Sequence, residues 1–243
     1  MASEVSSLED QAQKFAQSLT ATVHAVDPDC EPFTAKYVEG APRLAVRQSP
    51  SKGIPLKVDG VPFLDLKVIF ECCMDSKGDY LAVEKSRIEV TPKAGSGPTF
   101  RYEYDRNYTK APPAHMHVHA HRDAFTYLMA TAGNSSKRSK RRVESGKVPS
   151  LQDIHFPLGG HRFRPCLEDI LEILIEEFGV DMQPGTLKAL RDGRANWRRT
   201  QARSVARDDP QSAVDVLRSL GYDVVWNRSG EEPPVRWDRL EQY

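Results

Sequence analysis

The sequence predicts an α+β fold, an antiparallel β-meander sheet of five or six strands with one face covered by helices, plus a small basic helical C-terminal appendage. Three observations predict it. From about residue 43 to residue 158, apolar and polar residues alternate, as they do in strands with one apolar and one polar face. Turn-forming runs (DSKGD, PKAGSGP and NYTKAPPA) separate the alternating stretches. On either side of this region, apolar residues recur at helical spacing instead.

The first predicted element is an amphipathic helix over residues 6–23, at whose start Ser6 and Glu9 have the spacing of a capping box. Alternation then predicts five strands. They cover residues 64–73, 87–90, 100–105, 115–121 and 153–158. In the fourth of these strands, Met116 and Val118 belong to the apolar face, and four histidines belong to the polar face.

A second amphipathic helix is predicted over residues 165–179, where an apolar stripe lies opposite a row of acidic residues. Pro165 and Gly179 suit its first and last positions. We expect this helix to cover the apolar face of the sheet. A basic helix follows over residues 187–207, and Gly193 weakens the prediction that it is continuous.

Beyond it, Asp209 and Pro210 begin a short helix, and residues 222–226 are predicted as an edge strand. The chain therefore divides into four predicted parts. They are an N-terminal helix at 1–26, an α+β core domain at 43–180 with a basic insertion at 131–150, a C-terminal helical appendage at 184–226, and a disordered tail at 227–243.

The chain has 243 residues and no net charge, but its charges lie in blocks of opposite sign. Residues 165–181 carry six acidic residues and no basic one, whereas residues 182–207 carry seven basic residues and one acidic residue. Such blocks present a positive face to a polyanion even in a neutral protein. The four cysteines form no C-x-x-C pair, which argues against a disulfide framework and favours reduced thiols in a cytoplasmic protein. No signal peptide pattern and no run of 18 apolar residues occurs, so we expect no membrane partner.

Four of the seven histidines lie at alternate positions of AHMHVHAH, residues 114–121. A strand places their imidazoles on one face, with neighbours about 6 to 7 Å apart. If the preceding strand pairs in register, Arg101 and Glu103 share that face. The candidate catalytic residues are therefore Glu103, His115, His117, His119 and His121.

Three interpretations of this face remain open. First, His117 and His119 have the i, i+2 spacing of two ligands of one divalent metal ion, with zinc or manganese expected. The third ligand would come from another element, the candidates being Glu71, Glu103, Asp123, His155 and His161. Second, without metal, the histidines can serve as general acid and base in RNA cleavage. Third, they are polar side chains satisfied by water and by carboxylates across the strands.

Basic residues near this strand suit a phosphate-containing substrate. The candidate phosphate-binding residues are Arg101, Arg122, His161, Arg162 and Arg164, the last three in a turn before a helix, where backbone N–H groups attract anions. Two further basic elements suit salt-dependent binding of nucleic acid. They are the loop residues Lys137, Arg138, Lys140, Arg141 and Arg142, and the helix residues Arg191, Arg194 and Arg198. The alternative is that the turn residues have only a structural role and that the basic loop and helix are solvated surface.

FRYEYDRN, the histidine-rich strand and GGHRFRPCLEDILEILIEEFGV together resemble a widespread set of uncharacterised actinobacterial proteins, and are similar to the TumE-type toxin family. The similarity covers residues 60–180; the basic insertion and the C-terminal helices depart from the family pattern. It implies a toxin of a bacterial or phage conflict system that acts on RNA, with an antitoxin as protein partner. The matching positions are Arg101, Tyr102, His115, His117, His119 and His121.

We therefore expect a nucleic-acid-acting protein of toxin or defence type, with RNA favoured and an endoribonuclease as the candidate activity. The alternatives are a metal-binding protein or metal-dependent hydrolase with an H-x-H site on the same strand, and a non-catalytic module that binds protein or nucleic acid. The sequence has no P-loop, dinucleotide fingerprint, G-x-S-x-G elbow or H-E-x-x-H motif, which argues against those enzyme classes.

Overall fold

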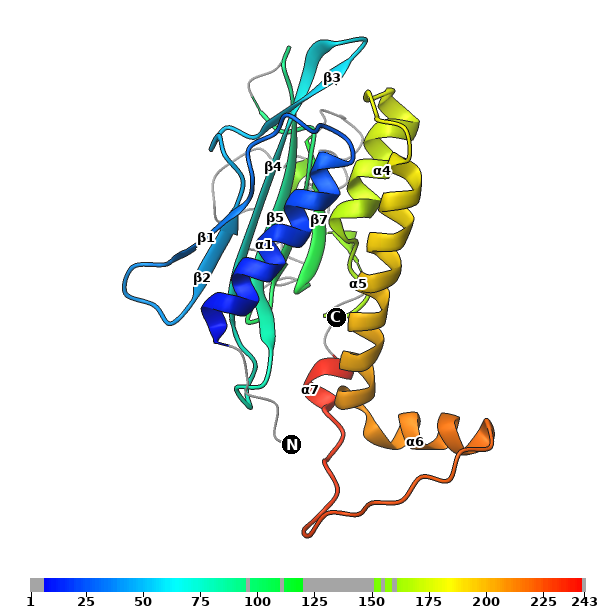
Figure 1. Ribbon diagram of the computed structural model, residues 1–243. Coiled ribbons are helices and arrows are strands. Elements are labelled where there is room, and N and C mark those ends of the chain that lie inside the picture. The colour runs from blue at the N-terminus through cyan, green and yellow to red at the C-terminus, as the bar shows by residue number, and fades with distance from the viewer. Residues whose placement is uncertain are drawn as a thin grey trace, which may run out of the picture.

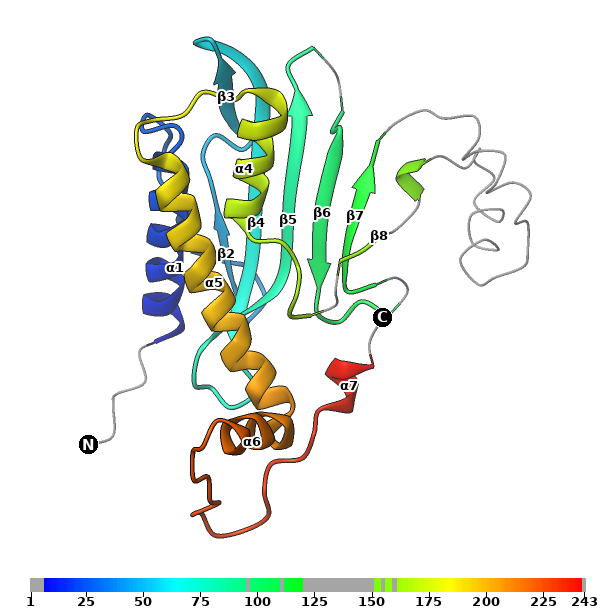
Figure 2. The same ribbon diagram turned by 90° about the vertical axis from the view of Figure 1, so that its right-hand side faces the viewer.

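The computed structural model describes residues 7–94, 97–109, 112–119, 151–153, 156–158 and 161–241. Within them, an eight-stranded antiparallel sheet carries helices on one face, which confirms the predicted fold class (Figures 1 and 2). The sheet has more strands than the five or six predicted, because several strands are too short to show alternation. The elements, in chain order, are α1 (Leu8–His24), β1 (Thr34–Tyr37), β2 (Leu44–Arg47), β3 (Ile54–Val58), β4 (Val61–Met74), β5 (Leu81–Pro92), β6 (Phe100–Asp105), β7 (Ala114–Val118), the 3-10 turn η1 (Leu151–Asp153), β8 (Phe156–Pro157), α4 (Leu167–Phe178), α5 (Thr186–Asp208), α6 (Pro210–Ser219) and α7 (Trp237–Leu240).

The strands follow one another across the sheet in the order β1-β2-β4-β5-β6-β7-β8. Strand β4 is long enough to pair with two shorter strands on the same side. Its first half pairs with β3, through Ile54 and Leu66, and its second half pairs with β2, through Leu44 and Cys72. Because all the paired strands are antiparallel and β4, β5, β6 and β7 pair in chain order, the side chains of one face line up from strand to strand across this part of the sheet.

A two-residue turn joins β3 to β4. Asp59 and Gly60 both have positive φ angles, 51° and 75°, as the two central residues of a tight hairpin turn require. Both backbone N–H groups donate to the carboxylate of Asp181, which lies just beyond α4. This contact ties the end of α4 to the edge of the sheet.

Helices α1, α4 and α5 cover one face of the sheet, and Figure 2 shows them in front of β2, β4 and β5. The apolar stripe of α1 is buried, and the ring of Phe15 meets Phe70 of β4 edge to face, with centroids 5.1 Å apart. In α4, Leu171 and Leu174 are fully buried. The predicted amphipathic helices and their apolar contact with the sheet are therefore confirmed.

Helix α5 is continuous through Gly193, where the sequence pattern weakened the prediction. A Cβ atom at this position would lie 2.6 Å from Oε1 of Glu168 on α4. Glu168 is buried and accepts a hydrogen bond from Thr22 of α1, so it has little room to move. Glycine therefore serves the close packing of α4 on α5, not a break in the helix.

Residues 222–226 form no strand, so that prediction is wrong. They follow α6 and are mostly exposed, away from any sheet edge that they could extend (Figure 2). Of the predicted disordered tail, residues 227–241 are described and include the short helix α7. The basic insertion at 131–150 lies outside the described residues. None of the described helices is both long and apolar enough to cross a membrane.

Candidate metal centre

Strands β6 and β7 bring three potential metal ligands together on the face of the sheet opposite α1, α4 and α5. The register pairs Glu103 with His115 and Arg101 with His117, as the sequence predicted for an in-register pair. Odd-numbered residues of both strands therefore share one face, while Tyr102 and Met116 project from the other. The ligand atoms of Glu103, His115 and His117 all lie within 4.8 Å of one another.

The distances within the cluster suit a coordinated ion. Nε2 of His117 lies 3.2 Å from Oε2 of Glu103, and Nε2 of His115 lies 3.4 Å from the same oxygen. In a tetrahedral zinc site with bonds near 2.0 to 2.1 Å, neighbouring ligand atoms are about 3.3 Å apart. The three side chains could therefore share one ion with little rearrangement.

Backbone carbonyls fix the orientation of both rings. Nδ1 of His115 lies 2.7 Å from the carbonyl oxygen of Pro112, and Nδ1 of His117 lies 2.6 Å from that of Gln152 in η1. A carbonyl oxygen only accepts, so each Nδ1 carries the proton and donates it. In the neutral ring, the lone pair then lies on Nε2, the atom that faces Glu103. Protein metal sites commonly use this second hydrogen bond to set the tautomer of a histidine ligand.

The two histidines are buried, which corrects the expectation that they lie on a solvated polar face. His115 is 3% exposed and His117 is 5% exposed. Their polar neighbours, including the carbonyls of Pro112 and Gln152, replace water as hydrogen-bond partners. Burial therefore rules out the water of the third interpretation as the main partner of these side chains, whereas Glu103 on the neighbouring strand is a cross-strand carboxylate of the kind that interpretation expected.

Two arginines complete the environment of Glu103. Nε of Arg87 lies 2.8 Å from Oε1 of Glu103, and Nε of Arg101 lies 3.2 Å from the same oxygen. Burial raises the pKa of Glu103, but its contacts with His115 and His117 and the charges of the two arginines outweigh burial and hold the pKa well below its usual range. Glu103 is therefore an ionised carboxylate at neutral pH.

A hollow of about 520 Å³ opens beside the cluster. Its lining includes Lys85, Arg87 and Arg101 together with Glu103 and both histidines. Side chains of opposite charge pair within it, as in the 3.1 Å contact between Lys85 and Asp105. A ligand in the hollow would reach both the cluster and several cationic groups.

His119 follows the same alternation but is not part of the three-residue cluster. Burial lowers the pKa of His119, and the nearby charge of Arg101 lowers it further. Its Nε2 atom is buried and finds no hydrogen-bond partner among the described residues. The structure thus groups His117 with His115, whereas the sequence interpretation paired His117 with His119. His121 lies outside the described residues.

Of the three candidates for a third ligand that the structure describes, Glu103 belongs to the cluster. Glu71 pairs with Arg43 at 2.9 Å. His161 lies near the hydroxyl of Tyr104, whose side chain projects from the opposite face of β6. Asp123 and His155 lie outside the described residues.

The predicted phosphate-binding residues do not form one group. Arg101 lies in the cluster, whereas His161, Arg162 and Arg164 lie on the helix side of the sheet. There, Nε of Arg162 pairs with Asp208 at 2.6 Å. Arg122 and the basic loop residues fall outside the described part of the chain; the latter are Lys137, Arg138, Lys140, Arg141 and Arg142.

The basic face of α5 is only partly available to a polyanion. Arg194 forms ion pairs with Asp169, at 2.6 Å, and with Glu172, and so joins α5 to α4. Arg191 and Arg198 are exposed. The same face of α5 thus packs against α4 through Arg194 and presents Arg191 and Arg198 to solvent.

Arg87 is the functional residue that the sequence analysis missed. The alternation of β5 placed it on the polar face, but only the register with β6, which sets Arg87 opposite Glu103, brings it to the cluster. The carbonyls of Pro112 and Gln152 gave no signal at all, because a backbone acceptor is not encoded by residue type.

No protein-family model, curated protein or solved structure matches this chain. The functional interpretation therefore depends on the geometry described above.

Proposed function

We propose that Glu103, His115 and His117 bind one divalent transition-metal ion and that the protein is a metal-dependent hydrolase. The observation that carries this proposal is the convergence of the three ligand atoms within 4.8 Å, with each Nδ1 held by a backbone carbonyl. Two histidines and one carboxylate are a common ligand set for catalytic zinc. The same set also binds iron and related metals.

Three protein ligands leave a coordination position for water or substrate, as catalytic sites require. A metal ion in this position would supply a Lewis acid and an activated water. The hollow beside the cluster is lined by the cations of Lys85, Arg87 and Arg101 and by the acidic residues Glu71, Glu103 and Asp105, so it offers a substrate groups of both charges. RNA is the proposed substrate class, in a toxin or defence setting, because the cations of the hollow can contact phosphate groups. The antitoxin partner and cytoplasmic location expected from the sequence are parts of the same proposal. Arg191 and Arg198 of α5 lie on the other face of the sheet and do not line the hollow.

Metal titration tests the centre directly. The protein is produced without a histidine tag, stripped with a chelator, and titrated with Zn²⁺ or Mn²⁺ by calorimetry. We expect one equivalent to bind, and Glu103→Gln to weaken binding by at least about 100-fold, because it removes a charged ligand. Glu89→Gln is the matched control, since Glu89 lies on the same face of β5 opposite Arg101 and outside the cluster. Absence of binding, or equal binding by both variants, would contradict the proposal.

A second candidate uses the same residues without metal. The distances from Glu103 Oε2 to the two Nε2 atoms also suit hydrogen bonds from protonated imidazoles. Histidines held by a carboxylate can act as general acid and base in RNA cleavage. RNA cleavage that persists in excess chelator and is lost in His117→Ala would favour this candidate. Cleavage that stops with chelator and returns with Zn²⁺ or Mn²⁺ would favour the hydrolase.

A further inference from the structure

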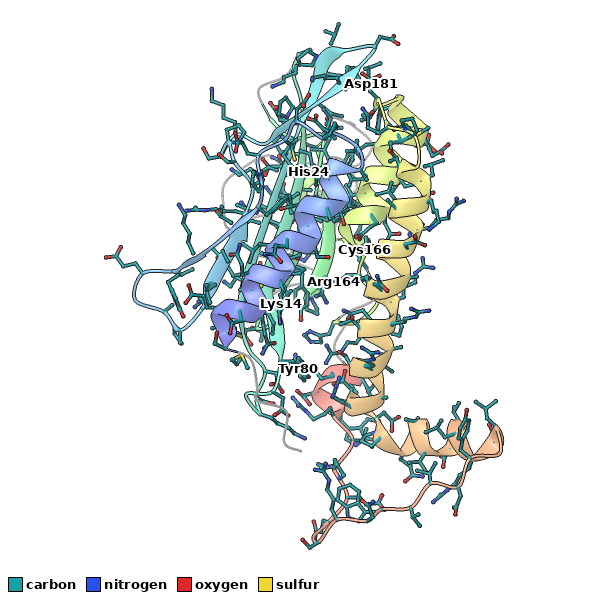
Figure 3. All side chains as sticks on the ribbon, viewed as in Figure 1. Lys14, His24, Tyr80, Arg164, Cys166 and Asp181 are labelled. Carbon is teal, nitrogen blue, oxygen red and sulfur yellow. The ribbon has the colours of Figure 1, made fainter. Side chains whose placement is uncertain are left out.

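A second cavity, of about 560 Å³, lies on the helix side of the sheet. Residues of α1, α5, β4 and β5 line it, together with the segment that leads into α4. Figure 3 labels Lys14, Arg164 and Cys166 at the space between α1 and α5, and Tyr80 at its lower end. Its volume is that of a typical small-molecule site.

The charged groups in the lining are strongly unbalanced, although the whole chain is neutral. Among the described residues that line the cavity, the single acidic one is Glu168, which accepts a hydrogen bond from Thr22. The basic residues are Lys14, Arg106, Arg162, Arg164, Arg203 and Arg207. Asp208 neutralises Arg162 through two hydrogen bonds, and the other five keep a net positive field in the cavity.

Arg164 is the central cation. Its guanidinium lies 3.9 Å from the ring centroid of Tyr104 and 5.1 Å from that of Trp197, and it donates to the carbonyl of His161. Of the carboxylates in the described part of the chain, none forms an ion pair with Arg164. Burial lowers the pKa of Arg164 to about 10, which still leaves it charged at neutral pH. A half-buried arginine without an acidic partner is costly unless an anion accompanies it.

Apolar and aromatic side chains complete the lining. They include Phe15, Phe70, Leu81 and Trp197. A ligand in this cavity would therefore contact cations with one part and hydrocarbon or ring surface with another. The exposed Lys14, Arg203 and Arg207 carry positive charge at the solvent side, where they would attract an anion.

We propose that this cavity binds a small organic anion, with its phosphate or carboxylate head at Arg164 and its apolar body against Phe15 and Trp197. The site is separate from the candidate metal centre, which lies on the opposite face of the sheet. Its ligand can thus bind whether or not a metal occupies the cluster.

Calorimetry and Trp fluorescence test the proposal with defined probes on the full chain. Adenosine 5′-monophosphate represents a ring body with a phosphate head, and decanoate represents a chain body with a carboxylate head. Adenosine and inorganic phosphate test the two halves of the first probe. We expect one of the two complete anions to bind at one equivalent, more tightly than its isolated parts and less tightly at high salt.

Two kinds of variant locate the binding. Arg164→Gln removes the central cation, and we expect about tenfold weaker binding or more. Because Arg164 also contacts two rings, Arg203→Gln provides a milder surface variant in which the fold is kept, with several-fold weaker binding expected. Arg199→Gln is its matched control, one helical turn away on α5 and outside the cavity lining.

Failure of both complete anions to bind at millimolar concentration would overturn the proposal. So would binding that Arg164→Gln, Arg203→Gln and Arg199→Gln leave equally unchanged. Both outcomes are independent of the metal titration, since the probes are tested on protein stripped with chelator.

Discussion

His117 on β7 reaches Glu103 on β6 diagonally: the two residues are not register partners, yet Nε2 of His117 lies 3.2 Å from Oε2 of Glu103. His115, the register partner of Glu103, lies slightly farther from the same oxygen, at 3.4 Å. One carboxylate oxygen thus meets two imidazoles that are two residues apart on one strand. This arrangement defines the candidate ligand set, which does not include His119, the next histidine along the strand.

The ligand set predicts an unequal response to histidine removal. We expect His115→Ala and His117→Ala each to weaken Zn²⁺ binding by at least about 100-fold, since even residues that only support a metal ligand contribute about 10- to 100-fold. His119→Ala should change affinity by less than about tenfold, because its side chain is not in the cluster. Competition with a chromogenic chelator measures all three. If His119→Ala weakened Zn²⁺ binding as much as His115→Ala, the result would instead support His117 and His119 as the ligand pair, as the sequence suggested.

Much of the fold could be predicted from the sequence, because alternation and helical spacing report directly on which side of an element is buried. The sequence analysis made the shared face of Arg101, Glu103, His115 and His117 conditional on β6 and β7 pairing in register, and the structure shows that pairing. Alternation shows which residues share a face. It does not show what covers that face, so the burial of the two histidines was missed.

The site was predicted less completely for a related reason. The ring orientations of His115 and His117 depend on carbonyls of Pro112 and Gln152, and the latter is 35 residues away along the chain from His117. Residue type carries no information on such contacts. Likewise, the turn before α4 has a sequence that suits phosphate, but the structure uses Arg162 to hold Asp208 at the end of α5.

Shortening one buried side chain of α4 should cause a large loss of stability. Leu174 is fully buried against the sheet, so Leu174→Ala should lower the free energy of unfolding by about 2 to 5 kcal/mol. The adjacent Ile173 is 39% exposed, and Ile173→Ala should cost much less. Urea denaturation of both variants measures the difference. Equal losses would mean that α4 does not pack on the sheet as described.

Gly193→Ala should destabilise the protein, although alanine is the better helix former by about 1 kcal/mol. The added Cβ would lie 2.6 Å from Oε1 of Glu168, and the side chain of Glu168 cannot withdraw without breaking its bond from Thr22. We expect a net loss of about 1 to 3 kcal/mol from this overpacking. In a Glu168→Ala background the clash is absent, and Gly193→Ala should become stabilising. A stabilising effect in the native background as well would show that α4 and α5 are less closely packed.

We expect Asp169, at the start of α4, to stabilise the folded protein in a pH-dependent way. Burial raises the pKa of its carboxyl group, but hydrogen bonds from the Cys166 backbone N–H and from Arg194 outweigh burial and leave the pKa below its usual value. Because the folded-state pKa is lower than the unfolded-state value of about 3.9, the stabilisation is complete above that value and is lost as the pH falls through the folded-state pKa. At neutral pH, Asp169→Asn should therefore cost about 1 kcal/mol, as for other residues that cap a helix.

That difference should shrink as the pH falls below about 4, where the unfolded-state carboxyl group takes up a proton, and it should be lost once the pH is below the lower folded-state pKa and the native carboxylate is protonated too. Glu176→Gln, at an exposed position of the same helix, is the control and should shift stability little at any pH. Thermal unfolding of the two variants and the native protein between neutral and acidic pH measures both effects. A cost of Asp169→Asn that stays constant down to acidic pH would show that the side chain acts through its shape and not through the charge that Arg194 and the helix N-terminus stabilise.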